Sequence, residues 1–465
     1  MEQFNLEKLD KQKSIHMIGI GGISMSALAV ILKTDGFSVT GSDFKDSSSV
    51  QNLIRQGIAV SVGHSPENIK DPAAVVYTAA ISRDNPELMY AKTLGVPVVE
   101  RAVLLGAIMK RYETPIAVSG THGKTTTTSM LSQVLMAEGL DPTILVGGIL
   151  PSIGSNMHIG KNEYLVTEAC EYCGSFLKFF PKISLILNVE EDHLDYFKDI
   201  NDIIDCFHTF AEITPEDGAL IVNGDDKNAL ASVAGINRPV ITFSTEDKMA
   251  DFFADSIAFN GNGCGEFTVL KNGEFYMEAA LSVPGPHNVK NALAVIAAAD
   301  LLGVTPESIQ KGFDAFGGTK RRFEQKGLYN GARVIDDYAH HPTEIMTTLK
   351  TAKTAGSGKV WCVFQPHTYT RAFKLKEEFS RSFKDADGVL VVDIYAAREK
   401  DTGLISSREL AEEIQKHSHN AQYIKSFEEA EAILKSKANP GDFVITLGAG
   451  DVNKIAEDLV AEKNQ

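Results

Sequence analysis

The sequence predicts an α/β protein of three domains, each built on a mostly parallel sheet covered by helices. A short apolar strand, a turn and a helix alternate along most of the 465 residues, and this pattern is typical of parallel sheets. That length also exceeds what a single hydrophobic core supports. The strand–turn–helix series starts anew near residues 112 and 322. The predicted domains are therefore 1–111, 112–321 and 322–465.

The first series predicts a Rossmann-like domain that binds a pyrophosphate. A strand at 14–18 runs into a glycine loop, and the pattern continues through strands at 38–40 and 74–78 to a helix at 101–110. The loop resembles a dinucleotide fingerprint with serine in the third glycine position and an acid where the ribose would bind. The residues of this predicted site are Gly19, Gly21, Gly22, Ser24 and Asp43. An NAD-dependent dehydrogenase is therefore one alternative, although no hydride-transfer site is evident elsewhere.

The second series predicts a central domain of the P-loop ATPase type. Its predicted parallel strands are 115–118, 164–167, 183–187 and 219–222. Between 240 and 283, short alternating segments separated by Asn-Gly turns predict a small antiparallel part. Two helices close the domain, one after His287 and one opened by Thr305-Pro306.

The third series predicts a C-terminal Rossmann-like domain. Its predicted strands are 333–336, 360–364, 389–392 and 443–447, followed by a last helix.

One loop predicts ATP binding. It lies between a strand ending at Val118 and a helix running to about Glu138, and it reads Gly120-Thr121-His122-Gly123-Lys124-Thr125-Thr126. Its glycines turn backbone N–H groups toward an anion, and the helix N-terminus adds its dipole. Lys124 supplies a positive charge for the outer phosphates, and the Thr125 hydroxyl can hold Mg²⁺. The two glycines are closer together than in the usual P-loop.

Two further strand ends predict a metal site beside this loop. Glu168 follows one strand, and Asp192 and His193 follow another. The carboxyl ends of parallel strands share one edge, so we expect Thr125, Glu168 and His193 to lie together. Mg²⁺ prefers oxygen ligands, which favours Glu168 and Thr125, whereas histidine is a less usual partner.

Composition excludes several other classes of protein. The net charge of −16 and the pI near 5.3 argue against a nucleic-acid or anionic membrane surface. The first residues, Met1-Glu2-Gln3-Phe4-Asn5, lack the apolar core of a signal peptide. No apolar run reaches the ~20 residues that span a bilayer, and five cysteines make no disulfide framework. A cytoplasmic protein with no nucleic-acid or membrane partner is predicted, with 320–322 (KRR) as a local basic site for phosphates.

Several motifs resemble signatures of the Mur ligase family. Three lie in the central domain: 119–126 (SGTHGKTT), 192–195 (DHLD) and 285–292 (GPHNVKNA). Four more resemble the members of this family that attach L-alanine: 19–26 (GIGGISMS), 336–344 (DDYAHHPTE), 365–367 (QPH) and 446–451 (TLGAGD). The resemblance covers essentially the whole chain, which is identified as a member of the family.

The resemblance implies a reaction. ATP phosphorylates the carboxylate of UDP-N-acetylmuramic acid, and the amine of L-alanine attacks the acyl phosphate. The tetrahedral intermediate collapses to the amide, ADP and phosphate. Lys124 and one or two Mg²⁺ ions would offset the repulsion between the γ-phosphate and the carboxylate. ATP is then a co-substrate in peptidoglycan precursor synthesis, and the enzyme is a monomer or homodimer whose third domain closes over ATP.

The resemblance also implies the roles of the site residues, with the glycine loop of the first domain holding UDP. The implied metal ligands are Thr125, Glu168 and His193. Besides the P-loop, the implied ATP-binding residues are His287, Asn288, Asn291, Arg322 and Asp337. The implied L-alanine site consists of Tyr338, His340, His367 and Arg371, since arginine suits a carboxylate. The implied catalytic residues are Lys124, Glu168, His193, Arg322 and His340.

Two departures from the family pattern and several alternatives stay open. Thr368 stands where many relatives have arginine, and Cys170 stands where many have aspartate. Cys170 and Cys173 form a CxxC, which we interpret as two reduced thiols, with a redox pair as the alternative. A structural role is expected for His341. A non-catalytic ATP-binding scaffold and a ligase of the same fold that adds another amino acid or a peptide are the alternative functions.

Overall fold

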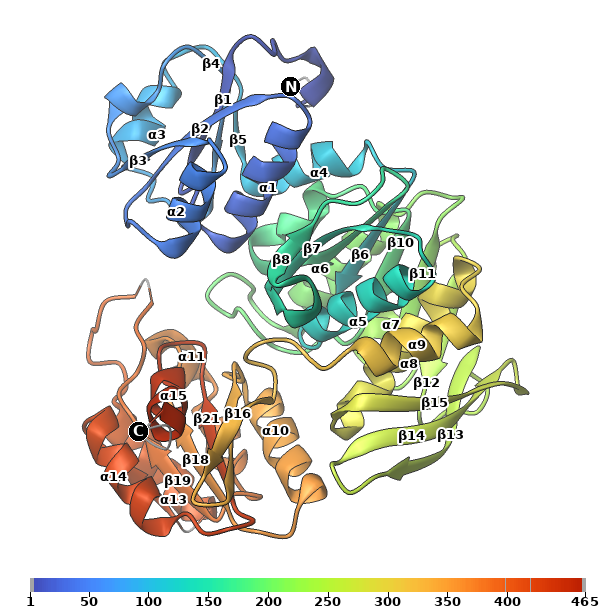
Figure 1. The fold of residues 1–465 in the computed structure, drawn as a ribbon, viewed down its shortest axis with the longest axis vertical. Coiled ribbons are helices and arrows are strands. Elements are labelled where there is room, and N and C mark those ends of the chain that lie inside the picture. Colours follow the sequence, from blue (N-terminus) through green and yellow to red (C-terminus); the bar gives the residue numbers. More distant parts are fainter. Residues whose placement is uncertain (1–3, 398, 419, 462–465) are drawn as a thin grey trace.

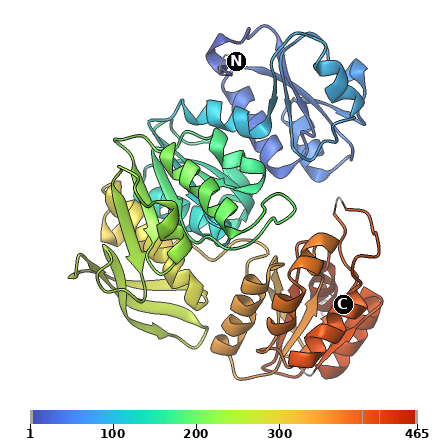
Figure 2. The same cartoon turned by 180° about the vertical axis from the view of Figure 1, so that it is seen from behind.

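The three predicted sheets are present in the computed structural model, which describes residues 4–397, 399–418 and 420–461 (Figure 1). Residues 1–3, part of the N-terminal segment discussed above, lie outside this range. The sheets have five, ten and six strands. They lie in three lobes, and the central lobe adjoins both others, as Figure 2 shows from behind. The predicted fold class is confirmed, whereas the boundaries at 111 and 321 stay predictions.

The first sheet is entirely parallel and has the order β3-β2-β1-β4-β5. Its strands are β1 (Ser14–Ile18), β2 (Ser38–Asp43), β3 (Ala59–Val62), β4 (Pro72–Tyr77) and β5 (Val98–Glu100). Its helices are α1 (Ile23–Thr34), α2 (Ser48–Arg55), α3 (Pro86–Ala91) and α4 (Arg101–Met109) with the short turns η1 (Leu6–Lys8) and η2 (Pro66–Asn68). The chain reverses its direction of winding between β1 and β4, so the crevice for a ligand lies at their carboxyl ends.

The central sheet has the order β15-β14-β13-β12-β11-β10-β6-β9-β7-β8. Its strands are β6 (Thr114–Ser119), β7 (Thr143–Leu150), β8 (Ser155–His158), β9 (Tyr164–Ala169), β10 (Ile183–Ile186), β11 (Ala219–Asn223), β12 (Val240–Ser244), β13 (Phe252–Phe259), β14 (Cys264–Lys271) and β15 (Glu274–Pro284). Its helices are α5 (Lys124–Ala137), α6 (Ile200–Glu212), α7 (Lys227–Ser232), α8 (Pro286–Leu301) and α9 (Pro306–Ala315) with η3 (Pro151–Ile153) and η4 (Tyr172–Lys178). The antiparallel part is smaller than predicted, because β12 follows the crossover helix α7 and pairs parallel with both β11 and β13.

The third sheet has the order β16-β17-β21-β18-β19-β20, and only β16 is antiparallel to its neighbour. Its strands are β16 (Glu324–Tyr329), β17 (Ala332–Asp337), β18 (Val360–Phe364), β19 (Gly388–Val391), β20 (Ala421–Tyr423) and β21 (Phe443–Leu447). Its helices are α10 (Pro342–Ala355), α11 (Tyr369–Lys374), α12 (Lys376–Arg381), α13 (Ser407–Ser418), α14 (Phe427–Lys437) and α15 (Asn453–Ala461).

The first and third domains meet the central domain in different ways. One apolar cluster continues from Met17 in β1 through Leu104 and Ile108 in α4 to Phe207 in α6. The third domain has its own apolar clusters, and among the described residues Leu194 is the one that joins them from the central domain. The contacts of the third domain with the P-loop, described below, are polar. A polar interface of this kind permits domain movement more readily than an apolar one.

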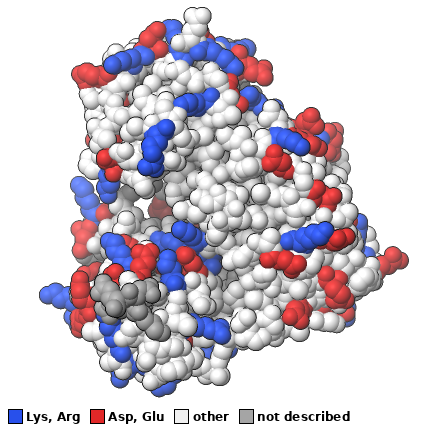
Figure 3. Space-filling model, in the orientation of Figure 1, with Lys and Arg blue, Asp and Glu red and all other residues white. Residues whose placement is uncertain are grey.

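The surface agrees with a chain of mixed charge. On the face drawn in Figure 3, acidic and basic side chains are interspersed. Among the described residues, no helix is both long and apolar enough to cross a membrane.

Candidate active site between the central and third domains

The loop from Gly120 to Thr126 connects β6 to α5. Gly120 and Gly123 have φ angles of 140° and 84°, which few residues other than glycine adopt. A Cβ on Gly123 would lie 2.8 Å from Asn291 Oδ1, so glycine lets α8 approach the loop. Asn188, just after β10, accepts from the His122 N–H at 2.7 Å and donates to the His122 carbonyl at 3.1 Å. Asn188 was not predicted as a site residue, although its place after a parallel strand was a signal.

Lys124 is held by a carboxylate that was not predicted as a site residue. Its Nζ donates to Glu171 Oε2 and to the Thr121 carbonyl, both at 3.1 Å. Burial opposes the charge, but the Glu171 carboxylate raises the pKa of Lys124 above its ordinary value. Within the described chain, the buried Glu171 Oε1 has no hydrogen-bond partner. The loop therefore carries a permanent cation beside an incompletely bonded carboxylate, and the position of Glu171 three residues after Glu168 was the available signal.

Thr125 and Glu168, the predicted oxygen ligands of Mg²⁺, both lie against the glycines of β7. Val118 in β6 pairs with Glu168 in β9, which places Glu168 beside the start of the loop. A Cβ on Gly147 would lie 3.1 and 3.2 Å from the two carboxylate oxygens of Glu168, and one on Gly148 would lie 3.4 Å from Thr125 Cγ2. Glu168 Oε1 accepts from the Gly147 N–H at 2.5 Å, so one of its oxygens is bonded to the backbone of β7. Hydroxyl and carboxylate oxygens are donors that suit Mg²⁺, and the predicted metal role of Thr125 and Glu168 stays a prediction.

His193 lies on the other side of Glu171. Its Nε2 is 4.0 Å from Glu171 Oε1 and 3.7 Å from Asp192 Oδ2, and its ring stacks obliquely on Tyr172. Glu171 therefore links His193 to Lys124. The metal role predicted for His193 stays a prediction, since its nearest acidic partners are Glu171 and Asp192 instead of Glu168.

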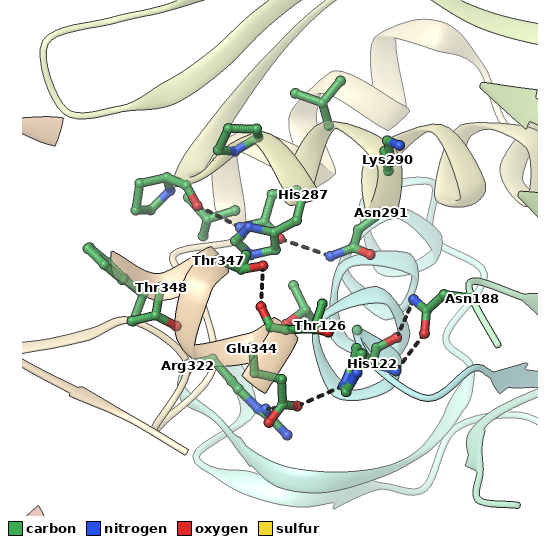
Figure 4. Close-up of a pocket in the computed structure, with 18 of the residues that line it drawn as sticks. His122, Thr126, Asn188, His287, Lys290, Asn291, Arg322, Glu344, Thr347 and Thr348 are labelled. Carbon is green, nitrogen blue, oxygen red and sulfur yellow. Dashed lines mark hydrogen bonds and ion pairs between the residues drawn. The ribbon is translucent and has the colours of Figure 1, made fainter. Parts of the chain in front are cut away.

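A cavity of about 660 Å³ opens in front of the loop, between the central and third domains. Many predicted ATP-binding residues line it: His122, Gly123, Thr125, Thr126, His287, Asn288, Asn291, Arg322 and Asp337. Figure 4 shows His287 and Asn291 on α8 and His122 and Asn188 at the loop around this space. Polar residues that the sequence analysis missed also line it: Asn188, Glu190, Asp225, Thr343, Glu344 and Thr348.

The start of α8 presents three adjacent predicted residues to this cavity. Asn291 Nδ2 donates to Asn288 Oδ1 at 3.0 Å, and Asn288 Nδ2 donates to the Pro284 carbonyl at 2.7 Å. Burial, with Arg322 nearby, lowers the pKa of His287 to about 4, so its imidazole is neutral at pH 7. Its buried Nδ1 has no hydrogen-bond partner among the described residues. A neutral, unpaired ring nitrogen at the cavity wall suits a heterocyclic base.

Arg322 and Asp337 lie at the hinge between the two domains. Asp337 accepts from the backbone N–H groups of Phe323 and Ala339 and from the Thr348 hydroxyl, all at 2.9–3.0 Å. Burial raises the pKa of Asp337 to about 6. Arg322 Nη1 lies 3.8 Å from Glu344 Oε1. In this structure Asp337 orders the hinge, and its predicted contact with ATP stays a prediction.

The third domain is fastened to the P-loop by polar contacts at the start of α10. Glu344 Oε1 lies 3.2 Å from His122 Nδ1 (Figure 4). The Thr343 hydroxyl donates to Glu190 Oε2 at 2.7 Å. His341 caps α10 and reaches the Glu191 carbonyl at 3.0 Å. These contacts describe a closed arrangement of the third domain over the loop.

A second cavity, of about 360 Å³, brings together three of the residues predicted to bind L-alanine: Tyr338, His367 and Arg371. Arg371 is already paired, with Nη2 2.9 Å and Nε 3.2 Å from Asp192 Oδ1. Burial opposes ionisation of Asp192, but Arg371 holds the pKa of that carboxyl well below its usual range. The guanidinium of Arg371, which was predicted to bind the alanine carboxylate, is therefore paired with Asp192. These two residues are 179 positions apart in the sequence.

His340 lies next to this second cavity. Its Nδ1–H donates to the Tyr338 carbonyl at 2.9 Å, and its ring centroid is 5.5 Å from that of His367. Burial lowers the pKa of His340 to about 4 and that of His367 to about 3, so both rings are neutral at pH 7. Thr368, at the position of the usual arginine, caps α11 by accepting from the Arg371 N–H at 3.4 Å.

The glycine loop of the first domain connects β1 to α1. The Gly21 N–H donates to Asp43 Oδ2 at 2.9 Å, and a Cβ on Gly21 would meet both Asp43 and Val50. The Ser24 hydroxyl accepts from Arg101 Nη1 at 3.0 Å. As described, neither of the two cavities above includes residues of this loop. Asp43 thus orders the loop in this structure, and its contact with a ribose stays a prediction.

Two lesser predictions are refined. Cys170 and Cys173 are both reduced. Burial raises the pKa of Cys170 to about 11, which disfavours a reactive thiolate. In the basic run, Arg321 is used internally: it pairs with Asp336 at 3.1 Å and donates to the Gly448 carbonyl at 2.7 Å. Arg321 is therefore committed to the third domain, and Arg322 is the arginine of the run that reaches the cavity.

Fold and site together define a protein of three α/β domains with a short P-loop, whose third domain covers a cavity in front of that loop. The chain matches three sequence profiles, described as the Mur ligase family catalytic domain (residues 14–113), the Mur ligase middle domain (118–299) and the Mur ligase glutamate ligase domain (321–450). The chain belongs to the Mur ligase family.

The relatives cover the whole chain. The chain is 52% identical over 463 residues to a UDP-N-acetylmuramate–L-alanine ligase of Acetivibrio thermocellus, covering 100% of this chain and 99% of the relative. It is similar to the solved structure of a UDP-N-acetylmuramate–alanine ligase of Thermotoga maritima, with 30% identity, a TM-score of 0.81 and coverage of 97% and 99%. A murein peptide ligase of Psychrobacter arcticus is 28% identical with a TM-score of 0.71, covering 97% of this chain and 98% of that one.

Proposed function

We propose that this chain is an ATP-dependent ligase that joins L-alanine to the carboxylate of UDP-N-acetylmuramic acid during peptidoglycan precursor synthesis. The observation that carries the proposal is the short P-loop, whose His122, Gly123, Thr125 and Thr126 line the cavity of about 660 Å³. Lys124 of the same loop is held beside them by Glu171. Full-length relatives that bear this activity in their names support the choice of substrates. ATP and nucleotide sugars are cytoplasmic metabolites, so the enzyme acts in the cytoplasm.

The P-loop binds the ATP phosphates in this proposal. The first N–H groups of α5 have no partners within the helix, and the helix dipole favours an anion at this end. Lys124 exchanges its contact with Glu171 for the transferring phosphoryl group. The base of ATP lies against His287, Asn288 and Asn291 on α8. Arg322 approaches the phosphates from the hinge.

Thr125 and Glu168 would hold Mg²⁺. The bound ion would neutralise charge on the phosphates and on the carboxylate that must approach each other. Lys124 and the helix N-terminus supply the remaining positive potential in a site that the third domain shields from water. Orientation of three substrates supplies much of the rate enhancement.

L-Alanine enters the second cavity, of about 360 Å³. His340 and His367 are neutral and only weakly basic, so they position the amine through hydrogen bonds and do not act as its general base. Arg371 can bind the alanine carboxylate only after its ion pair with Asp192 breaks. If that ion pair persists, Arg371 instead joins the third domain to the central domain. The UDP part of the sugar nucleotide lies at the Gly19 loop.

The test is phosphate release from ATP, measured with UDP-N-acetylmuramic acid and a panel of amine substrates. The panel contains L-alanine, glycine, L-serine, D-glutamate and the tripeptide that a murein peptide ligase would use. We expect strict dependence on the sugar nucleotide and the highest kcat/KM with L-alanine. Glycine and L-serine are expected to react with lower kcat/KM, because one methyl group contributes only about 1–3 kcal/mol of discrimination.

The same assay discriminates the alternatives. Preference for the tripeptide would assign the chain to the murein peptide ligases. NAD reduction with a hydroxy acid and no ATP use would instead indicate a dehydrogenase. ATP binding without turnover on any of these substrates would indicate a scaffold.

A further inference from the structure

Three side chains of ligand type from two domains meet beside the P-loop. They are His122 in the loop, Glu190 after β10 and His341 at the start of α10, and one ligand atom of each lies within 4.8 Å of the others. His122 Nε2 is 3.5 Å from Glu190 Oε2, and the two imidazole centroids are 4.7 Å apart. The cluster therefore spans the interface that the third domain closes.

Hydrogen bonds orient His122 as a ligand. Its Nδ1 lies 3.2 Å from Glu344 Oε1, so the proton on Nδ1 is donated to that carboxylate. Its Nε2 is buried and has no hydrogen-bond partner within the described residues. An imidazole whose one nitrogen donates to a carboxylate, while the other is unpaired, has the arrangement of a metal-binding histidine.

His341 is oriented in the same way by the backbone. Its Nε2 lies 3.0 Å from the Glu191 carbonyl, which can only accept, so Nε2 carries the proton. Its Nδ1 accepts from the Thr343 N–H at 3.4 Å as the cap of α10, a long hydrogen bond that a metal ion at Nδ1 would replace. The Thr343 hydroxyl in turn orients Glu190 Oε2 from 2.7 Å. Each of the three ligands is thus fixed by a second hydrogen bond.

We propose that His122, Glu190 and His341 bind one divalent transition-metal ion of the zinc type, at a site separate from the Mg²⁺ position at Thr125 and Glu168. Two imidazoles and one carboxylate suit Zn²⁺, Co²⁺ or Ni²⁺ better than Mg²⁺, which prefers oxygen. The proposal does not depend on which amine or sugar nucleotide the enzyme uses.

The geometry needs little adjustment. Bonds of about 2.0–2.1 Å in tetrahedral coordination place ligand atoms about 3.3 Å apart. The 3.5 Å between His122 Nε2 and Glu190 Oε2 meets this requirement. The ligand atom of His341 lies within 4.8 Å of the other two, so α10 must move toward the loop by up to about 1.5 Å to complete the site. The fourth position remains for water or for a phosphate oxygen in the adjoining cavity.

A proton is the competing occupant of His122. Burial lowers the pKa of His122, but Glu190 and Glu344 together raise it to about 10. An imidazolium between two carboxylates and a metal-bound imidazole are therefore alternatives at the same nitrogen. A metal ion would also be bound by His341, whereas a protonated His122 makes no favourable interaction with the neutral ring of His341. This difference makes His341 the residue on which the test turns.

The experiment is titration of the tag-free full-length protein with Co²⁺ in the presence of excess Mg²⁺, followed by visible absorption. We expect one equivalent to give the intense d–d bands of tetrahedral cobalt, with loss of the bands when Zn²⁺ is added. The His341→Asn variant keeps an effective helix cap but removes the imidazole. We expect it, and Glu190→Gln, to weaken cobalt binding about a hundredfold or more.

His208→Ala is the matched control, because His208 lies on α6 beside Glu212 and outside the cluster. It is expected to bind Co²⁺ as the wild type does. Unchanged affinity in His341→Asn would overturn the proposal. So would weak octahedral absorption alone in the wild type, which would leave the imidazolium as the only occupant of His122, or an equal loss of affinity in His208→Ala.

Discussion

Two strand–glycine–helix junctions of this molecule share a backbone design but differ in charge. At the Gly19 loop, the protein's own carboxylate, Asp43, accepts from the Gly21 N–H at 2.9 Å. At the P-loop, the ammonium of Lys124 projects over the turn and meets Glu171 at 3.1 Å. Each loop therefore contacts an internal carboxylate, but only the second carries a cation that an incoming phosphate could claim.

The two junctions also differ in their cover. The Gly19 loop belongs to a domain that is packed on the central domain through an apolar cluster. The P-loop is covered by a domain fastened through polar contacts such as His122 with Glu344. The backbone geometry of both loops favours anion binding. The P-loop differs from the Gly19 loop by its lysine and by a covering domain held through polar contacts, and these features suit catalysis as well as binding.

Removing the cation should give the largest effect. We expect Lys124→Ala to lower kcat for phosphate release by about a thousandfold, as loss of a phosphate-stabilising cation does elsewhere. The measurement is steady-state ATP turnover with both other substrates present. Lys124→Arg serves as the charge-retaining control and should recover part of the rate. Amide formation at the normal rate by Lys124→Ala would show that the two loops do not differ in this way.

Removing the internal anion of the P-loop should give a smaller and divided effect. In Glu171→Gln the carboxylate no longer competes with phosphate for Lys124, so KM for ATP should fall by about three- to tenfold. The kcat should fall as well, because the ammonium loses the contact that aligns it. Initial rates over a range of ATP concentrations separate the two parameters. An increased KM for ATP would instead show that Glu171 helps to bind the nucleotide.

Removing the internal anion of the Gly19 loop should affect a different substrate. We expect Asp43→Ala to raise KM for the sugar nucleotide about tenfold, the cost of one charge-assisted hydrogen bond. KM for ATP should stay unchanged, and Asp43→Asn, which retains an acceptor for the Gly21 N–H, should lie between. Equal increases in both KM values would contradict separate roles for the two loops.

The sequence predicted the local parts of both loops and missed what meets them across long distances. Strand, glycine turn and helix follow from apolar runs and glycine positions, and both junctions were predicted. Glu344 lies 222 residues from His122, and Arg371 lies 179 residues from Asp192. Periodicity records only neighbours along the chain, so these pairings depend on the order of strands and on how the domains dock. Even with the resemblance, the partners of Lys124 and Arg371 required the structure.

The smallest predicted effect concerns the hinge that places the third domain over the P-loop. Burial raises the pKa of Asp337 from 3.8 to about 6. Between these values the folded state binds more protons than the unfolded state, so the free energy of unfolding falls as pH rises through this window and levels off above it. The expected contribution is about 1–3 kcal/mol. Glu87 in the first domain has a pKa shift of the opposite sign. Burial raises the pKa of Glu87, but hydrogen bonds with His16, Ser42 and His64 lower it below its ordinary value.

Trp361, the single tryptophan, lies in β18 and reports unfolding of the third domain alone. Urea unfolding followed by its fluorescence at pH 5 and pH 7.5 should show a larger loss of stability with rising pH in the wild type than in Asp337→Asn. The asparagine variant loses one acceptor for Phe323, Ala339 and Thr348 and so should be less stable at both pH values. Its deficit should nevertheless shrink as pH rises, because asparagine does not ionise. A deficit that is constant between the two pH values would mean that Asp337 titrates normally, and the hinge would then place no charge cost on closing the third domain over the P-loop.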